Sequence, residues 1–282
     1  MLRYLLLPLL AIGSAFAQTS SQPGTPAAAA SSAEDWVKKG QEQYKAGQYQ
    51  EATLSFEAAA RLDRKSIEAK LGLANASMKL WVTGGGSAAA ENNYFRARNT
   101  LLDVLDQEPD NKKALSALSR LALQRANSTA DRQVRTEILD EVRAWNLRLI
   151  AVDPNDQGAH YALGVIAWTR CLSPESQSHN LPIVKRSDSD VPLEVQARLS
   201  YRAICKEPVE EGILHLNKSL EKDKDSDASM GYLAALYNMK ASYEDSPEDA
   251  ERDRQSSREW TAKAESVRKS KADAGSGVTS NQ

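Results

Sequence analysis

The sequence predicts an all-helical fold in which antiparallel helix pairs stack one on another. The chain contains only three Phe, and no segment shows a convincing alternation of apolar and polar residues, so strands are not expected. Acidic, turn-forming segments recur at residues 62–64, 107–111, 152–156 and 222–225, and a helical stretch follows each of them. Together these observations favour a chain of repeated helical units.

The clearest unit spans residues 33–66. Its small residues, Gly40 and Ala52, are placed where two antiparallel helices approach most closely. Large residues fill the space around that contact; they are Trp36, Tyr44, Tyr49 and Phe56. This block resembles a tetratricopeptide repeat, a helix pair whose pattern W-x2-L-G-x2-Y…A-x3-F…P recurs about every 34 residues. The match is degenerate, because Lys39 stands for the Leu, the Tyr falls one residue late, and Arg64 stands for the Pro.

The remaining units repeat parts of this pattern. The helical stretches after the turns are residues 67–80, 112–126, 157–170 and 227–240. Pro109 and Pro154 lie in two of the turns, where a residue without an N–H donor is well tolerated. Further matches are Leu163-Gly164, Ala97-x3-Leu101 and Gly212-x3-Leu216. The resemblance implies a right-handed superhelical solenoid of about five antiparallel helix pairs, at residues 33–66, 67–111, 112–156, 157–224 and 225–270.

Some units depart from the standard repeat length. Residues 83–87 form a glycine-rich loop in the second pair, and residues 131–152 form a long second helix in the third. The fourth pair carries an insertion at 172–208, where loop-like residues 173–190 precede an extra amphipathic helix at 191–204. Such an insertion is either a partner-binding loop or a tolerated surface loop. The last helix is capped by Ser246, runs to about residue 269 and is expected to cover the end of the solenoid.

The two ends of the chain are expected to lie outside the helical domain at 33–270. Arg3, an apolar run at 5–12 and the segment Ala15-Phe16-Ala17 are typical of a signal peptide at 1–17 that is cleaved after Ala17. The run is too short to span a bilayer, so an exported protein, periplasmic or secreted, is expected, with an uncleaved membrane tether as the alternative. Residues 18–32 and 271–282 are expected to be disordered, because they offer almost nothing to bury.

The charge balance argues against two classes of partner. The chain has 36 basic and 38 acidic residues, a formal net charge of −2. Without a basic excess or a polybasic cluster, neither nucleic-acid binding nor binding to a membrane surface is indicated. No stable membrane insertion is expected after cleavage.

The chain contains only two cysteines, Cys171 and Cys205, and they flank the insertion. In an oxidising compartment such a pair is more often a disulfide than two thiols. Closing this loop would contribute about 4 kcal/mol in the chain-entropy model. The alternative is two thiols that lie too far apart to bond.

No catalytic, cofactor or metal-binding pattern is found. The histidines, His160, His179 and His215, have no partner at helical spacing and are interpreted as structural or surface residues. Residues 223–227 resemble the start of a calcium loop, but Ala228 and Ala234 replace its glycine and its closing Glu. Nucleophile-elbow, phosphate-loop and dinucleotide motifs are also missing from the sequence, so neither an enzyme nor a cofactor is expected.

The first helix of each pair is expected to line a concave wall that binds a protein or peptide. By register with the repeat family, the candidate residues on this wall are Gln41, Tyr44, Lys45, Asn75, Met78, Lys79, Arg120, Tyr161 and Trp168. Lys45, Lys79 and Arg120 would form a mildly basic strip suited to an acidic or carboxylate-bearing peptide. Alternatively, Tyr44, Met78 and Trp168 pack between repeats, and the charges are solvated. Val37 stands at the first lysine site of the family's chaperone-tail clamp, so that ligand is not expected.

The sequence therefore predicts an exported, non-enzymatic interaction scaffold of the bacterial cell envelope. The segment 232–237, Tyr-Leu-Ala-Ala-Leu-Tyr, is similar to a late helix in a group of exported bacterial repeat proteins. The alternative is a small-ligand binder or enzyme whose pocket forms where the 172–208 insertion folds over the wall. Self-association through the edges of the solenoid is a third possibility.

Overall fold

The computed structural model describes residues 32–172 and 192–276, and it is helical almost throughout. The helices are α1 (Ala33–Lys45), α2 (Tyr49–Leu62), α3 (Ile67–Thr83), α4 (Ala88–Gln107), α5 (Lys112–Ser128), α6 (Arg132–Val152), α7 (Gln157–Cys171), α9 (Leu193–Lys222), α10 (Asp227–Ala241) and α11 (Pro247–Ser276). No strand occurs in these two ranges. The expected signal peptide, most of the spacer, the 173–190 loop and residues 277–282 lie outside the described residues.

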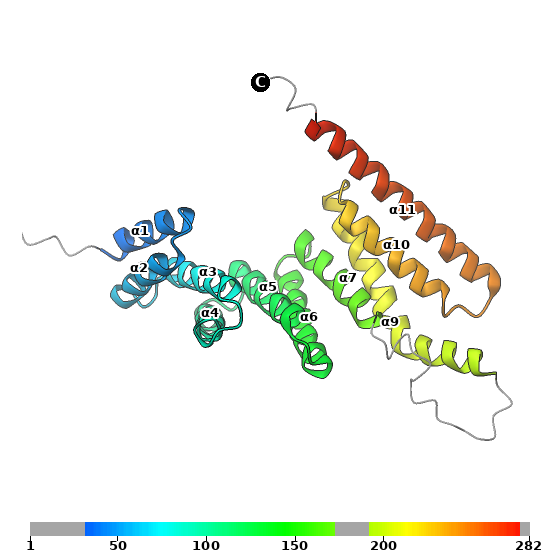
Figure 1. Cartoon of the computed structure of the whole chain (residues 1–282), viewed down its shortest axis with the longest axis horizontal. Coiled ribbons are helices and arrows are strands. Elements are labelled where there is room, and N and C mark those ends of the chain that lie inside the picture. The colour runs from blue at the N-terminus through cyan, green and yellow to red at the C-terminus, as the bar shows by residue number, and fades with distance from the viewer. Residues whose placement is uncertain (1–31, 173–191, 277–282) are drawn as a thin grey trace, which may run out of the picture.

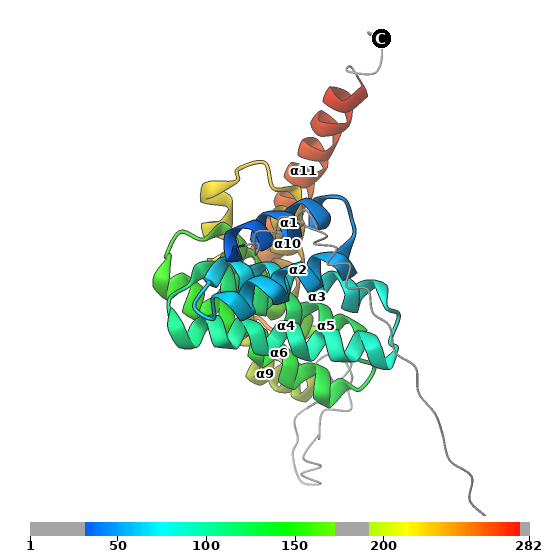
Figure 2. The same ribbon diagram turned by 90° about the vertical axis from the view of Figure 1, so that its left-hand side faces the viewer.

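The helices form five pairs that follow one another along the long axis of the molecule (Figure 1). The pairs are α1/α2, α3/α4, α5/α6, α7/α9 and α10/α11, and the second helix of each pair packs on the first helix of the next. First helices also touch one another, α1 with α3, α3 with α5, and α7 with α10. This arrangement confirms the predicted solenoid. The view along the row shows the C-terminal part of α11 projecting away from the other helices (Figure 2).

The acidic turns between pairs share one geometry, which explains why each starts a helix. Ser66, Asn111, Asp156 and Ser226 are the N-caps of α3, α5, α7 and α10. Each side chain accepts a hydrogen bond from the backbone N–H three residues later, and each backbone N–H donates to the carbonyl three residues earlier. The fourth turn has this geometry without a proline, because the side chain of the cap residue, and not a proline, accepts the hydrogen bond from the backbone N–H in the first turn of the helix.

Small residues allow the close helix contacts that the sequence predicts. A Cβ atom built on Gly164 would lie 2.3 Å from Leu216 Cγ, and one built on Gly212 would lie 2.6 Å from Ala167 Cβ. Both glycines lie where α7 crosses α9, so any side chain there would force the two helices apart. Gly47, at φ 76°, adopts the left-handed conformation that lets α1 turn tightly into α2.

The insertion differs from the prediction. Residues 191–204 do not form a separate helix, because α9 continues without a break from Leu193 through Pro208 to Lys222. Proline inside a helix removes one hydrogen bond, at a cost of about 3 kcal/mol. Cys205 and Val209, which flank Pro208, are both fully buried in the C-terminal core, and their burial holds the helix continuous. The 192–208 part of the insertion is therefore an extension of the second helix of the fourth pair.

The C-terminal helix is longer than predicted. It ends at Ser276 and not near residue 269, so the first residues of the expected 271–282 tail are helical. Its start agrees with the sequence, since Ser246 Oγ accepts a hydrogen bond from Asp249 N at 3.0 Å. Residues 270–274 contain no Gly or Pro, so the helix runs on to Gly275 and Ser276. Lys271 Nζ, 2.9 Å from Asp227 Oδ1, ties this stretch to α10.

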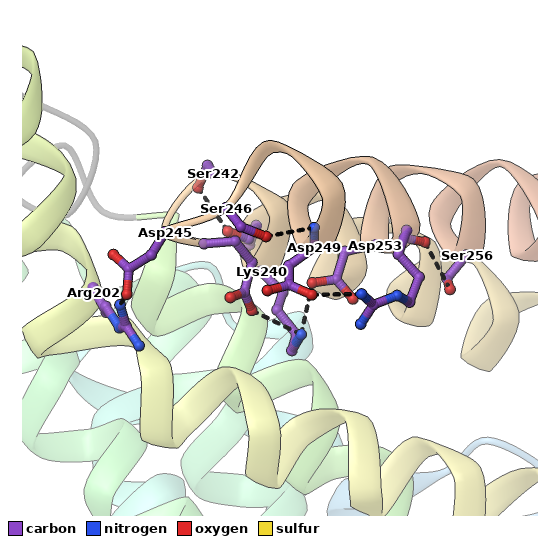
Figure 3. Close-up of polar contacts among 11 residues, drawn as sticks. Arg202, Lys240, Ser242, Asp245, Ser246, Asp249, Asp253 and Ser256 are labelled. Atoms are coloured by element: carbon purple, nitrogen blue, oxygen red, sulfur yellow. Dashed lines mark hydrogen bonds and ion pairs between the residues drawn. The ribbon is translucent and has the colours of Figure 1, made fainter.

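Ion pairs join the two helices of the C-terminal pair to each other and to α9 (Figure 3). Lys240 Nζ on α10 lies 2.6 Å from Asp253 Oδ2 on α11 and 2.8 Å from Glu244 Oε1. Burial acts to lower the pKa of Lys240, but its hydrogen bonds to the two carboxylates outweigh burial and raise it. Arg202 of α9 pairs with Asp245 in the α10–α11 turn. Three helices therefore meet at this turn through opposite charges.

Candidate functional site

The first helices of the first three pairs enclose a groove of about 1060 Å³, called here the α1–α3–α5 groove. It is lined by Gln41, Tyr44, Lys45, Phe56, Ile67, Glu68, Leu71, Gly72, Asn75, Asp110, Asn111, Lys112, Lys113 and Arg120. The N-caps Ser66 and Asn111 fix where α3 and α5 begin, and this sets which of their residues face the groove.

The floor of the groove is apolar and tightly packed. Tyr44, Ile67 and Leu71 are half-buried, and the ring of Tyr44 meets Tyr49 edge-on with centroids 5.3 Å apart. Phe56 lies beneath them and is 2 % exposed. A Cβ atom on Gly72 would lie 2.4 Å from Phe56 Cε1, so only glycine lets α3 sit this close to the ring.

Hydrogen bonds link neighbouring first helices across the wall. Gln41 Nε2 on α1 donates to Glu68 Oε1 on α3 at 2.7 Å. Arg120 Nη2 on α5 donates to Asn75 Oδ1 on α3 at 3.2 Å. The groove is therefore one continuous wall of three connected helices.

Cations outnumber carboxylates in the groove. Lys45, Lys112, Lys113 and Arg120 stand against Glu68 and Asp110. Lys112 Nζ pairs with Asp153 Oδ2 at 3.0 Å, whereas no carboxylate in residues 32–172 and 192–276 lies within ion-pair distance of the other three. The groove thus offers exposed positive charge beside an apolar floor.

The structure separates the nine predicted wall residues into four locations. Gln41, Tyr44, Lys45, Asn75 and Arg120 line the groove. Lys79 is exposed on α3 outside it, and Met78 is 5 % exposed, packed in the core with Trp81.

Tyr161 and Trp168 lie on α7, far along the solenoid. Both are half-buried, and their rings meet Tyr232 of α10 with centroids 5.9 Å and 5.2 Å apart. Met78 and Trp168 therefore pack between helices, as in the alternative interpretation of the sequence, and do not line the groove.

Sequence reasoning missed several groove residues. Ile67 and Leu71 supply much of the floor, and Lys112 and Lys113 add charge at the start of α5. The sequence did offer a pattern for them: Ile67, Lys112 and Lys113 lie in the first turn, and Leu71 at the start of the second turn, of helices that follow the acidic turns. Those first turns face the groove in both α3 and α5.

The alternative pocket under the 172–208 insertion stays a prediction, because residues 173–191 lie outside the described residues. One hollow of about 470 Å³ is lined by α9 residues between 199 and 210. The described residues also contain no group of three or more His, Cys, Asp or Glu placed to hold a metal ion. None of their helices combines the length and the apolar character that a membrane span requires.

His160 and His215, interpreted from the sequence as separate structural or surface residues, form a buried pair between α7 and α9. Their Nδ1 atoms lie 2.8 Å apart, and His160 Nε2 lies 3.0 Å from the carbonyl oxygen of Pro154. A carbonyl only accepts, so neutral His160 carries its proton on Nε2 and its Nδ1 accepts from His215 Nδ1–H. The remaining nitrogen, His215 Nε2, lies 3.7 Å from Glu211 Oε1.

The environment of this pair disfavours protonation of His215. Burial lowers the pKa of His215, and His160 and Lys218 lower it further, while Glu211 acts in the opposite direction. Glu211 is itself engaged by Arg143 of α6, with Nη2 and Oε1 2.8 Å apart. His179 lies outside the described residues. The pair joins two helices of one repeat.

The two cysteines also meet. Cys171 ends α7, Cys205 lies within α9, and both belong to the C-terminal core. Cys171 Sγ lies 4.0 Å from the backbone oxygen of Cys205, and both residues are thiols in this structure, so the disulfide stays a prediction.

The fold and the groove define the class of this protein as a tetratricopeptide-like helical solenoid with a concave groove. Comparison with protein-family models and with curated protein sequences gives no match. Among solved structures, the chain is similar to MamA 41-end from Desulfovibrio magneticus RS-1, with 16% identity, a TM-score of 0.53, and 84% of this chain and 96% of that chain covered.

A second similar structure is a MamA RS-1 double mutant, also at 16% identity and a TM-score of 0.53, with 85% of this chain and 96% of that chain covered. A thermophilic TPR protein of Thermus thermophilus is more distant, with 19% identity, a TM-score of 0.41, and 73% of this chain and 99% of that chain covered. At these identities the comparisons show the fold alone.

Proposed function

We propose that this protein is a non-enzymatic interaction scaffold that binds an acidic segment of a partner protein in the α1–α3–α5 groove. The observation that carries the proposal is the groove itself, in which an apolar floor and exposed cations share one connected wall. At about 1060 Å³ it is at the upper end of the range of small-ligand pockets, and a chain segment of several residues fits it better than a compact molecule.

The floor supplies the burial that a bound segment needs. Tyr44, Ile67 and Leu71 present half-buried apolar surface, which large side chains of a partner would cover. Aromatic residues in such pockets contribute strongly to binding, because they remove much apolar area from water at low cost in conformational entropy.

The rim supplies the preference for acidic chains. Arg120 uses one N–H toward Asn75, and the other donors of its guanidinium group are available to a carboxylate. Lys45 and Lys113 are exposed and add two further positive charges. An acidic segment gains these contacts, whereas a basic segment meets like charges.

Fluorescence anisotropy with labelled peptides of equal length tests this function. One set alternates Leu with Glu and the other alternates Leu with Lys. We expect only the acidic set to bind, with an affinity that falls as salt is raised. Each exposed charge contact contributes up to about 1 kcal/mol, so Lys113→Glu combined with Arg120→Glu is expected to weaken binding about 30-fold.

Lys79→Glu is the matched control, since Lys79 is an exposed residue of α3 outside the groove. It reverses one charge on α3, a neighbouring helix of the same wall, and is expected to leave the affinity unchanged. Equal binding of both peptide sets, or equal losses in Lys79→Glu and in the groove variant, would contradict the proposal.

We also propose that the scaffold is exported and acts in the bacterial cell envelope. The support is the signal-peptide pattern of residues 1–17, which lie outside the described residues. N-terminal sequencing of the protein recovered from the fractionated host is expected to begin at Gln18. An intact N-terminus at Met1 in the cytoplasmic fraction would contradict export.

A further inference from the structure

We propose that Cys171 and Cys205 form an intrachain disulfide that is made while the chain folds and is then sealed inside the C-terminal core. The inference is independent of the groove and concerns a covalent link between α7 and α9.

The two cysteines are in contact although they are 34 residues apart in sequence. Cys171 is 1 % exposed and Cys205 is 0 % exposed, and both are present as thiols. The thiol of Cys171 donates a long hydrogen bond to the backbone oxygen of Cys205, with Sγ and oxygen 4.0 Å apart. A disulfide requires the two Cβ atoms to approach within a few ångströms, and side chains in contact meet that need with little movement.

The burial of the two thiols determines at which stage of folding the disulfide can form. The hydrogen bond with Cys205 and then burial raise the pKa of Cys171, so its reactive thiolate is suppressed in the folded protein. Thiol–disulfide exchange proceeds through the thiolate and needs access for the reagent. Oxidation therefore takes place before the core closes, and afterwards the same burial protects the bond from reductants.

The reaction is an exchange with a disulfide-bearing oxidant, such as glutathione disulfide. The thiolate of one cysteine attacks a sulfur of the oxidant, forms a mixed disulfide and releases one thiolate. The second cysteine, as its thiolate, attacks the protein sulfur of that mixed disulfide and releases the other. The protein loses two protons and two electrons, and the oxidant is reduced to two thiols.

The disulfide would reinforce the contact between α7 and α9, which noncovalent interactions already stabilise. Near Cys205, Tyr201 Oη donates to the carbonyl oxygen of Cys171 at 3.4 Å, and Arg202 pairs with Asp245. These contacts hold the extended part of α9 to α7 and to the α10–α11 turn. A covalent link at this place also removes conformations from the unfolded chain.

The test begins with the full mature chain, reduced and unfolded, then refolded in a glutathione redox buffer. The product is unfolded again in denaturant with an alkylating reagent and its intact mass is measured. We expect a monomer that lacks two hydrogen atoms and takes up no alkyl group, and a proteolytic digest in which the peptides of Cys171 and Cys205 are linked. Two alkylated thiols, or a disulfide-linked dimer, would overturn the proposal without any variant being needed.

Two further measurements test the sealed position and its effect on stability. Dithiothreitol is expected to leave the bond intact in native buffer and to reduce it once denaturant is added. The oxidised chain is expected to melt ~10 °C above the reduced chain. The variant Cys171→Ala with Cys205→Ala is the matched control, and its melting temperature should not respond to the reductant. Rapid reduction of the native protein, or equal melting of both forms, would contradict the sealed, stabilising role.

Discussion

Replacing Gly164 by Ala is expected to destabilise the fourth helix pair, because α7 and α9 leave no room for one methyl group. The added Cβ would lie 2.3 Å from Leu216 Cγ, 2.6 Å from Cδ2 and 2.9 Å from Cδ1. The clash involves the branch point of Leu216, which is 0 % exposed and cannot swing into solvent. Gly212 makes a second close contact from the opposite helix, 2.6 Å from Ala167 Cβ, so sliding one helix along the other offers no relief.

The expected magnitude combines two opposing effects. Overpacking a closed core costs about 1–3 kcal/mol, and a contact this short belongs near the upper end. Alanine regains up to about 1 kcal/mol over glycine in a helix interior. The net loss for Gly164→Ala is therefore about 2 kcal/mol, which lowers the melting temperature by about 4–8 °C.

Gly158→Ala is the matched control, because it makes the same change in the same helix where space is available. Its Cβ would meet only Asp156 Oδ1, at an ordinary 3.5 Å, so we expect a gain of a few tenths of a kcal/mol. Thermal and urea unfolding followed by far-UV circular dichroism compares the two variants with the parent chain. If Gly164→Ala proved as stable as Gly158→Ala, the close crossing of α7 and α9 would be refuted.

Three further perturbations probe the other buried polar contacts. Burial lowers the pKa of His215, so the unfolded chain binds more protons than the folded chain, and stability is expected to fall as the pH drops below about 6.5. The midpoint of urea unfolding, measured across this pH range, should depend less on pH in His215→Leu. Asn146→Ala removes a 2.7 Å hydrogen bond that Asn146 Nδ2 donates to the buried Ser119 Oγ, and a loss of about 1–2 kcal/mol in urea unfolding is expected, with a smaller loss if Ser119 is replaced as well. Lys240→Met leaves the Asp253 carboxylate buried without its cation. The melting temperature of Lys240→Met should therefore fall further than that of the double variant Lys240→Met with Asp253→Asn. The opposite order would contradict the role of this ion pair.

The helices and turns could be predicted because their determinants are local. In the turn from Asp153 to Asp156, the first carboxylate accepts from the Asn155 N–H and the second caps α7, all within four residues. The glycine positions also predicted where helices approach closely, because a glycine such as Gly164 inside a helix is favoured where another helix crosses it. Such features let the sequence alone predict five pairs and their order.

Predictions from local sequence were wrong where the packing of distant residues determined the structure. A separate helix was expected at 191–204, but the burial of Cys205 and Val209 keeps α9 continuous through Pro208. The wall residues show the same limit. Register placed Gln41, Asn75 and Arg120 in the groove, yet it could not tell that Met78, on the same helix as Asn75, turns into the core.

By itself, the sequence determined the helix pairs and the turns that separate them, because each depends on residues a few positions apart. It marked Gly164 and Gly212 as points of close approach, but the residues that they meet, Leu216 and Ala167, lie far away along the chain. The tertiary structure alone decided which distant residues meet. His160 reaches His215, Cys171 reaches Cys205, and Arg120 joins Asn75 only after the pairs stack. The physical reason is that the angle between successive pairs is set by the packing of whole helix faces, and that angle is not encoded at any single position.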